Sequence, residues 1–230
     1  MQRRRFASAL PVLALAPHLP AAAQGLAGIS EADATRGLKT ALETGAMAAV
    51  KLLGRNDGFW GNPQVRIPLP GHLKDAAKIL SALGRRKDVE ELELAMNRAA
   101  EAAVPMARKL LADAVRTMTV RDAKRILTGG DTSVTEFFAE RTRQPLSTSF
   151  LPVVRQATAK VKLRDKADRL AQKAQSFGLL RMEDATIDHY VTRKALDGLY
   201  FMVGEEERRI RRDPVGTGSA LLGKVFGALR

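Results

Sequence analysis

The stretch from Leu92 to Pro105 constrains the fold more than any other, because it predicts a helix covered in methyl groups. Its apolar residues recur at steps of three or four, which places them on one helical face: Leu92, Met96, Ala99, Ala103, Met106 and Leu110. Alanines also fill much of the remaining circumference, so neighbouring helices can approach from several sides. The pattern predicts a helix in the middle of a bundle, with a bend at Pro105.

Polar residues interrupt this helix and a second helix near the end of the chain. Asn97 and Arg98 lie four and three residues before Glu101, spacings at which helical side chains meet. In the later helix, Glu206 interrupts an apolar stripe, and the i,i+4 spacing pairs Glu205 with Arg209 and Glu207 with Arg211. We predict a buried polar cluster from both helices: Asn97, Arg98, Glu101, Glu206, Arg209 and Arg211.

Two interpretations of this cluster are open. Glu101 and Glu206 could meet across two packed helices and act as an acid and a base. The alternative is a structural ion-pair network, since arginines lie near both carboxylates and a guanidinium binds a carboxylate at two points. We favour the structural interpretation. It predicts that Glu101→Ala loosens or unfolds the protein.

The composition favours helices and one domain. Of 230 residues 45% are hydrophobic but 5% aromatic, and alanine, leucine and arginine are abundant. The chain has no cysteine, which excludes disulfides, thiolate chemistry and a lipid-modified N-terminal cysteine. We predict an all-α, single-domain bundle of about six to eight helices over residues 24–230.

Residues 1–23 resemble a cleavable signal peptide. Arg3, Arg4 and Arg5 form a basic start, residues 6–16 a modest apolar run, and residues 21–23 an A-x-A cleavage site. The pattern predicts a periplasmic protein exported by the general secretory route, or by the twin-arginine route that Arg3-Arg4-Arg5-Phe6 also fits. No later segment has the length of apolar sequence that spans a bilayer.

Capping residues and apolar periods divide the rest of the chain into helices. The first is expected after Ser30 and ends at Gly54, and Asp88 is a candidate N-cap of the central helix, which reaches about Met118. Capping boxes are predicted at 119–122 and 133–136. The other helices are expected at 73–83, 123–127, from 133, 146–174 with a break near Pro152, 187–212, and after the glycine-rich turn beyond Pro214.

Residues 56–70 cannot form a helix, because glycine, asparagine and proline are too frequent there. This segment contains the single tryptophan, and residues before proline favour extended backbone. It could be a binding loop, with these candidate residues: Asp57, Phe59, Trp60 and Arg66. We favour a structural strap in which Phe59, Trp60 and Ile67 cover the end of the bundle.

Six ordered motifs resemble a bacterial family called domain of unknown function 4197. They are Asp57-Gly58-Phe59, residues 65–70 (VRIPLP), 96–101 (MNRAAE), Met118-Thr119 with Asp122-Ala123, 190–199 (YVT…ALDGL), and 205–214 (EEE…IR.DP). The resemblance covers nearly all of the chain after about residue 30, and it departs from the family pattern at about 162–184. It implies an exported, mostly helical protein and brings no established activity or catalytic residues.

Three classes of function follow from these patterns. The formal charge of +13 points to anionic partners. The leading prediction is a non-enzymatic envelope protein that binds an apolar or amphipathic ligand or a protein partner, with its basic surface facing anionic lipid or polymer. An enzyme using Glu101 and Glu206 is the alternative. Nucleic-acid binding is third, because no basic motif is interleaved with aromatic residues.

No cofactor or metal site is predicted. Beyond the signal the chain has two histidines, His72 and His189, and no cysteine. No G-x-S-x-G motif presents a nucleophilic serine, and residues 216–218 fall short of a phosphate loop.

Overall fold

The fold is all-α, as predicted, in a computed structural model that describes residues 31–82, 84, 86–160, 165 and 187–213. The regular elements of this part are, in chain order, α2 (Glu31–Leu53), α3 (Gly71–Ala82), α4 (Arg86–Ala103), the 3₁₀ turn η1 (Val104–Met106), α5 (Ala107–Arg116), α6 (Val120–Thr128), α7 (Ser133–Lys160) and α9 (Ile187–Arg212). The predicted signal peptide, the end of the predicted 146–174 helix and the last predicted helix lie outside the described residues.

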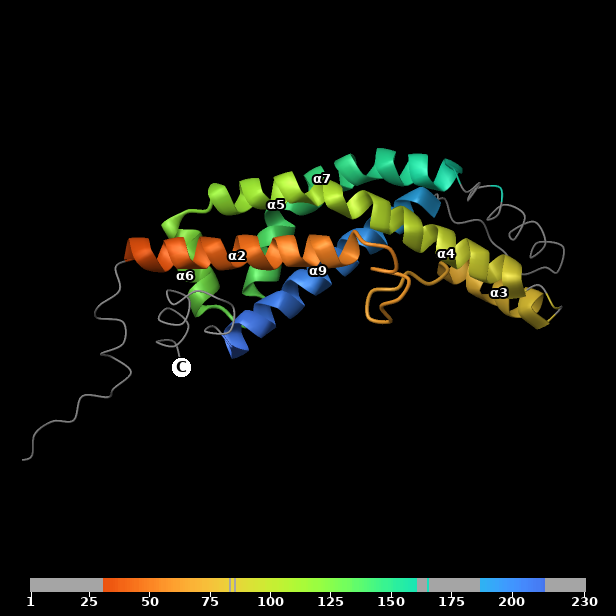
Figure 1. The fold of residues 1–230 in the computed structure, drawn as a ribbon, viewed down its shortest axis with the longest axis horizontal. Coiled ribbons are helices and arrows are strands. Elements are labelled where there is room, and N and C mark those ends of the chain that lie inside the picture. The colour runs from red at the N-terminus through yellow and green to blue at the C-terminus, as the bar shows by residue number, and fades with distance from the viewer. Residues whose placement is uncertain (1–30, 83, 85, 161–164, 166–186, 214–230) are drawn as a thin grey trace, which may run out of the picture.

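The helices form one elongated bundle around a continuous apolar core (Figure 1). Helix α9 lies against α7, α2 and α4, so it contacts most of the other long elements. Helix α3 packs on α4 at one end of the molecule, and α6 lies at the other end against α2 and α7. Four fully buried phenylalanines contribute to this core: Phe59, Phe137, Phe138 and Phe150.

The second half of the small-residue helix α4 is mostly buried, as its alanines predict. Ala99, Ala100 and Ala103 are at most 1% exposed, which allows α4 to pack closely on α7 and α9. The bend predicted at Pro105 is present as η1, which separates α4 from α5. Proline has no N–H to continue the α-helical hydrogen bonds, so the chain tightens into a 3₁₀ turn there.

The predicted break near Pro152 does not occur. Helix α7 continues from Ser133 to Lys160 through both Pro145 and Pro152. Each proline removes the donor to the carbonyl four residues earlier, at Arg141 and Thr148. Both of these residues are exposed, so water can replace the missing donor and the helix continues.

Two predicted helix starts also differ from the structure, while a third agrees. Thr119 and Asp122 form the expected capping box of α6, with backbone N–H to side-chain oxygen distances of 2.9 and 3.2 Å. Asp88 lies within the first turn of α4 rather than at its cap. Ser133 is the first residue of α7, and its hydroxyl donates to the Ile126 carbonyl oxygen at 3.0 Å instead of capping its own helix.

None of the described helices combines the length and the apolar character needed to span a membrane.

Candidate functional site

Residues 56–70, called the strap below, connect α2 to α3 through a series of turns followed by extended backbone. The turn at its start requires glycine at position 58, because a Cβ there would lie 2.4 Å from the Leu53 carbonyl oxygen. The preceding residue, Asp57, has a positive φ of 61°. The turn from α2 into the strap therefore depends on the absence of a side chain at position 58 and on a left-handed backbone conformation at Asp57.

The Glu101 carboxylate fixes the first half of the strap. Its Oε1 accepts hydrogen bonds from the backbone N–H groups of Phe59 and Trp60, at 3.0 and 3.1 Å. Its Oε2 accepts from Arg98 Nη1 at 2.7 Å, and Arg98 Nη2 donates to Asp57 Oδ1 at 2.7 Å. The hydrogen bond to Glu101 raises the pKa of Arg98 above its usual value. The Glu101 carboxylate thus connects α4 to two backbone amides of the strap, and its neighbour Arg98 connects α4 to Asp57.

The Asn97 side chain fixes the second half of the strap. Its Oδ1 accepts from the Ile67 N–H at 2.8 Å, and its Nδ2 donates to the Ile67 carbonyl oxygen at 2.9 Å. The same Nδ2 donates to the Glu93 carbonyl oxygen at 2.8 Å. Asn97 is 0% exposed. Its side-chain amide satisfies both backbone groups of Ile67, as the backbone of a neighbouring β-strand would.

The strap has a buried side and an exposed side. Phe59 and Ile67 are at most 1% exposed and belong to the core. Trp60 is partly exposed, and the Arg66 guanidinium lies over its ring at 3.5 Å from the ring centroid. Arg66 also pairs with Glu93 at 3.3 Å. Of the candidate binding residues, Asp57, Trp60 and Arg66 therefore reach the surface, whereas Phe59 does not.

Glu206 and Arg209 form a separate pair on α9. Arg209 Nη2 lies 2.5 Å from Glu206 Oε2, and the arginine side chain is 65% exposed. Glu206 packs against α2, where its Cβ lies 3.4 Å from the position that a Cβ would take if Gly45 had a side chain. None of the described contacts joins Glu206 to Glu101. The six residues of the predicted cluster are therefore divided among three places: the strap for Asn97, Arg98 and Glu101, the side of α9 near α2 for Glu206 and Arg209, and the ends of α6 and α7 for Arg211. The helix faces that carry them have different neighbours.

Helix α9 contains two buried carboxylates, Asp188 and Glu207, and the sequence pattern places neither of them in the core. The i,i+4 spacing does pair Glu207 with Arg211. Glu207 Oε1 accepts from Arg211 Nη2 at 2.9 Å and from the Val134 N–H at 3.3 Å, at the start of α7. Arg211 also donates to the Ile126 carbonyl oxygen and to Ser133 Oγ, at 3.1 and 2.9 Å. This group joins the ends of α6, α7 and α9.

Burial raises the pKa of Glu207, and the hydrogen bond from Arg211 opposes that rise. Glu207 Oε2 is buried without a hydrogen-bond partner. The signal that could have found this residue is a second apolar row on the helix, in which Leu196, Tyr200 and Val203 lead to Glu207 at steps of four and three.

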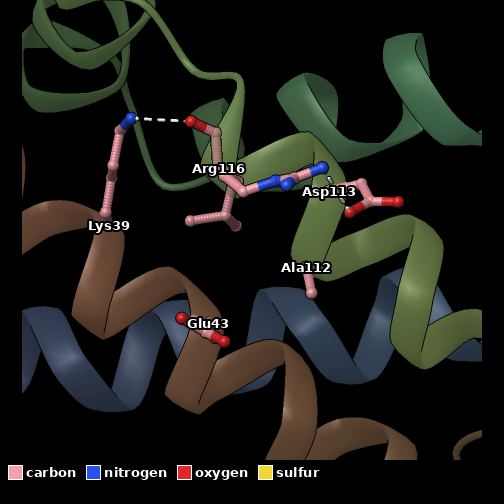
Figure 2. Close-up of a pocket in the computed structure, with 6 residues that line it drawn as sticks. Lys39, Glu43, Ala112, Asp113 and Arg116 are labelled. Carbon is pink, nitrogen blue, oxygen red and sulfur yellow. Dashed lines mark hydrogen bonds and ion pairs between the residues drawn. The ribbon is translucent and has the colours of Figure 1, made fainter.

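A hollow of about 450 Å³ lies between α2 and α5 (Figure 2). Four of the six residues that line it are charged: Lys39, Glu43, Asp113 and Arg116. Lys39 Nζ donates to the Arg116 carbonyl oxygen at 2.9 Å, and Asp113 pairs with Lys109 and Arg116. The hydrogen bond from Lys109 lowers the pKa of Asp113. Charged residues therefore form most of the border of this hollow, and nothing in the sequence pattern predicts it.

Acidic and histidine side chains are the residues of this chain that could hold a metal ion. Within the described ranges, no three of these side chains lie close enough together to hold a metal ion.

Comparison with known protein families places most of the chain within a family model. A protein-family model with the description "Protein of unknown function (DUF4197)" matches residues 28–227. No curated protein and no solved structure matches the chain. The matched range contains every described helix, the strap and both buried polar groups.

Proposed function

This chain belongs to the DUF4197 family, whose description assigns no activity, and we propose from its geometry that it is a non-enzymatic interaction module of the cell envelope. The strap is its recognition surface, and a protein is its partner. The observation that carries this proposal is the use of Asn97, Arg98 and Glu101 to hold one surface segment in a single conformation.

A segment held in this way is suited to recognition. Loops positioned by a rigid scaffold commonly carry binding residues, and fixing a loop before binding removes the entropic cost of ordering it. The strap presents a tryptophan and an arginine in contact with each other, and these residue types dominate the binding energy of protein interfaces. The hydrogen bonds that fix the strap on α4 and the exposed Trp60–Arg66 pair both support a role in recognising a protein.

The alternative of acid–base catalysis has less support. Both oxygens of Glu101 already accept hydrogen bonds, from two backbone amides and from Arg98. Glu206 pairs with Arg209 in a different part of the bundle. Paired acids and bases need to share a site, and these two carboxylates do not share one.

The hollow between α2 and α5 does not favour an apolar ligand. The hollow between α2 and α5 is lined mainly by charged side chains, whereas sites for apolar ligands are lined mainly by hydrophobic ones.

Export is part of the proposal and rests on the pattern of residues 1–23. Fractionation of cells that express the whole chain is expected to place the protein in the periplasm. Arg3→Lys with Arg4→Lys separates the two export routes, because twin-arginine export requires the arginine pair whereas general secretion accepts lysine. A protein retained in the cytoplasm would contradict the proposed location.

Photo-crosslinking in the native host tests the strap as a recognition surface. A photoreactive amino acid at Gln64, which is exposed on the strap, is expected to give a discrete adduct with one protein. The adduct is expected to disappear when Trp60→Ala or Arg66→Ala is added, since each removes part of the exposed pair.

The same probe at Thr40, an exposed position on α2, is the matched control and is expected to give no such adduct. An adduct that persists in both substituted backgrounds, or the absence of any adduct at Gln64, would overturn the proposal for the strap.

A further inference from the structure

Exposed cations lie near the place where the end of α2 meets the bend between α4 and α5. Residues 44–56 and 102–112 contain no acidic residue and contribute four exposed cations: Lys51, Arg55, Arg108 and Lys109. The first half of α4 differs, because acidic residues at 88, 90, 91 and 93 outnumber its two basic ones at 86 and 87. We call the four cations, with Pro105 and Met106 between them in sequence, the basic face.

Three of these cations have no counter-charge in the part of the chain that the structure describes. Lys51, Arg55 and Arg108 make no hydrogen bond or ion pair with the described residues, and Lys109 pairs with Asp113. Elsewhere arginines are commonly paired, as Arg125 is with Glu140, Arg141 with Asp122 and Arg143 with Asp197. Lys51, Arg55 and Arg108 therefore contribute little to the fold and remain available to an anion.

The backbone brings these residues together and adds an apolar side chain. Gly54 lies against Pro105, whose Cγ would be 3.0 Å from a Cβ at position 54, so Arg55 leaves α2 beside the bend. Met106 at the bend is 51% exposed, the highest value among the exposed large hydrophobic residues. Figure 1 shows α2 and α5 running side by side up to this point.

We propose that the basic face binds the surface of an anionic lipid bilayer. Lys51, Arg55 and Arg108 contact head-group phosphates, and Met106 enters the interfacial layer beneath them. A nucleic acid would contact the cations equally well, but it offers no apolar layer to Met106, and no aromatic side chain of the basic face could stack on its bases. This face uses none of the residues proposed for protein recognition on the strap.

Vesicle sedimentation with the full chain tests this proposal. Binding is expected to vesicles of phosphatidylcholine mixed with phosphatidylglycerol, and not to phosphatidylcholine alone. Each basic residue near an anionic leaflet strengthens binding by about fivefold, so Lys51→Glu with Arg108→Glu is expected to weaken it by at least about 25-fold. Met106→Ser is expected to remove the part of the binding that survives high salt.

Lys74→Glu with Lys87→Glu is the matched control, since it makes the same change in net charge at exposed positions on α3 and α4. It is expected to keep most of the affinity at physiological ionic strength, where charges beyond about 8 Å are screened. The melting temperatures of both double variants show whether they are still folded. Replacing Lys51 and Arg108 by Gln removes their charges without adding acidic groups, so it tests the same contacts with a milder change.

Equal loss of binding in the two double variants would overturn the proposal, because net charge alone would then explain it. A DNA duplex that binds as tightly as the anionic vesicles, together with no effect of Met106→Ser on vesicles, would overturn it in favour of a general polyanion surface.

Discussion

At the scale of single residues, Glu101 has the largest effect predicted for stability. Glu101→Ala leaves the N–H groups of Phe59 and Trp60 without their acceptor and removes one partner of Arg98. The two amides lie at buried and partly buried positions, so we expect the free energy of unfolding to fall by about 3 kcal/mol. Urea denaturation of the two proteins measures this difference.

Glu90→Ala is the matched control for this substitution, because Glu90 also pairs with an arginine in α4 but is 50% exposed. Its expected cost is below about 0.5 kcal/mol. If Glu101→Ala cost no more than Glu90→Ala, the carboxylate would not be holding the strap.

Glu207 gives a prediction for pH dependence. Burial raises its pKa in the folded protein above the usual value of 4.5, so the folded state holds the proton more tightly than the unfolded state. The stability due to this proton is present below pH 4.5 and is lost as the pH rises through the folded pKa. The stability of the natural protein relative to Glu207→Gln should therefore fall as the pH rises from acid to neutral.

Urea denaturation of both proteins over this pH range measures the difference. The reverse slope, with the natural protein gaining on Glu207→Gln as the pH rises, would mean that the pairing with Arg211 outweighs burial.

At the scale of elements, the contact between the strap and α9 depends on a glycine. A Cβ at position 198 would lie 2.7 Å from Phe59 Cε1 and 3.3 Å from Val65 Cβ. Phe59 is fully buried and has no room to withdraw, so we expect Gly198→Ala to lower the free energy of unfolding by about 1–2 kcal/mol despite the better helix propensity of alanine.

Gly71→Ala on α3 is the control for this substitution, since a Cβ there meets nothing within 4 Å. Thermal unfolding compares the two variants. Equal melting temperatures would mean that the strap does not pack tightly on α9.

Elements with strong local signals could be predicted from the sequence. Helix α9 has the bounds expected from its apolar period, and the capping box at Thr119 starts α6. The continuation of α7 through Pro152 could not be predicted, because it depends on solvent reaching the carbonyl that loses its donor. Ser133 could not be placed either, since its hydroxyl bonds to the distant Ile126 carbonyl and to Arg211.

At the scale of the whole molecule, periodicity predicts which face of a helix is buried but not what covers it. The polar triplet of α4 was recognisable, because polar residues in a helix of alanines need partners. Their partners in the strap are backbone groups for Asn97 and Glu101 and the Asp57 carboxylate for Arg98. These groups lie 30 to 42 residues earlier in the chain, so local spacing gives no sign of them. Helical spacing also does not determine which faces of α4 and α9 meet. The sequence therefore could not show that Glu101 and Glu206 lie in different parts of the bundle.

Amide hydrogen exchange followed by NMR measures whether α4 holds the strap in one conformation. The N–H groups of Phe59, Trp60 and Ile67 donate to Glu101 and Asn97, so they are expected to exchange as slowly as amides inside α4. The N–H of Gln64, which bonds to Asn62 at an exposed position, is expected to exchange much faster. Fast exchange at Phe59, Trp60 and Ile67 would contradict the account, because the strap would then open independently of α4.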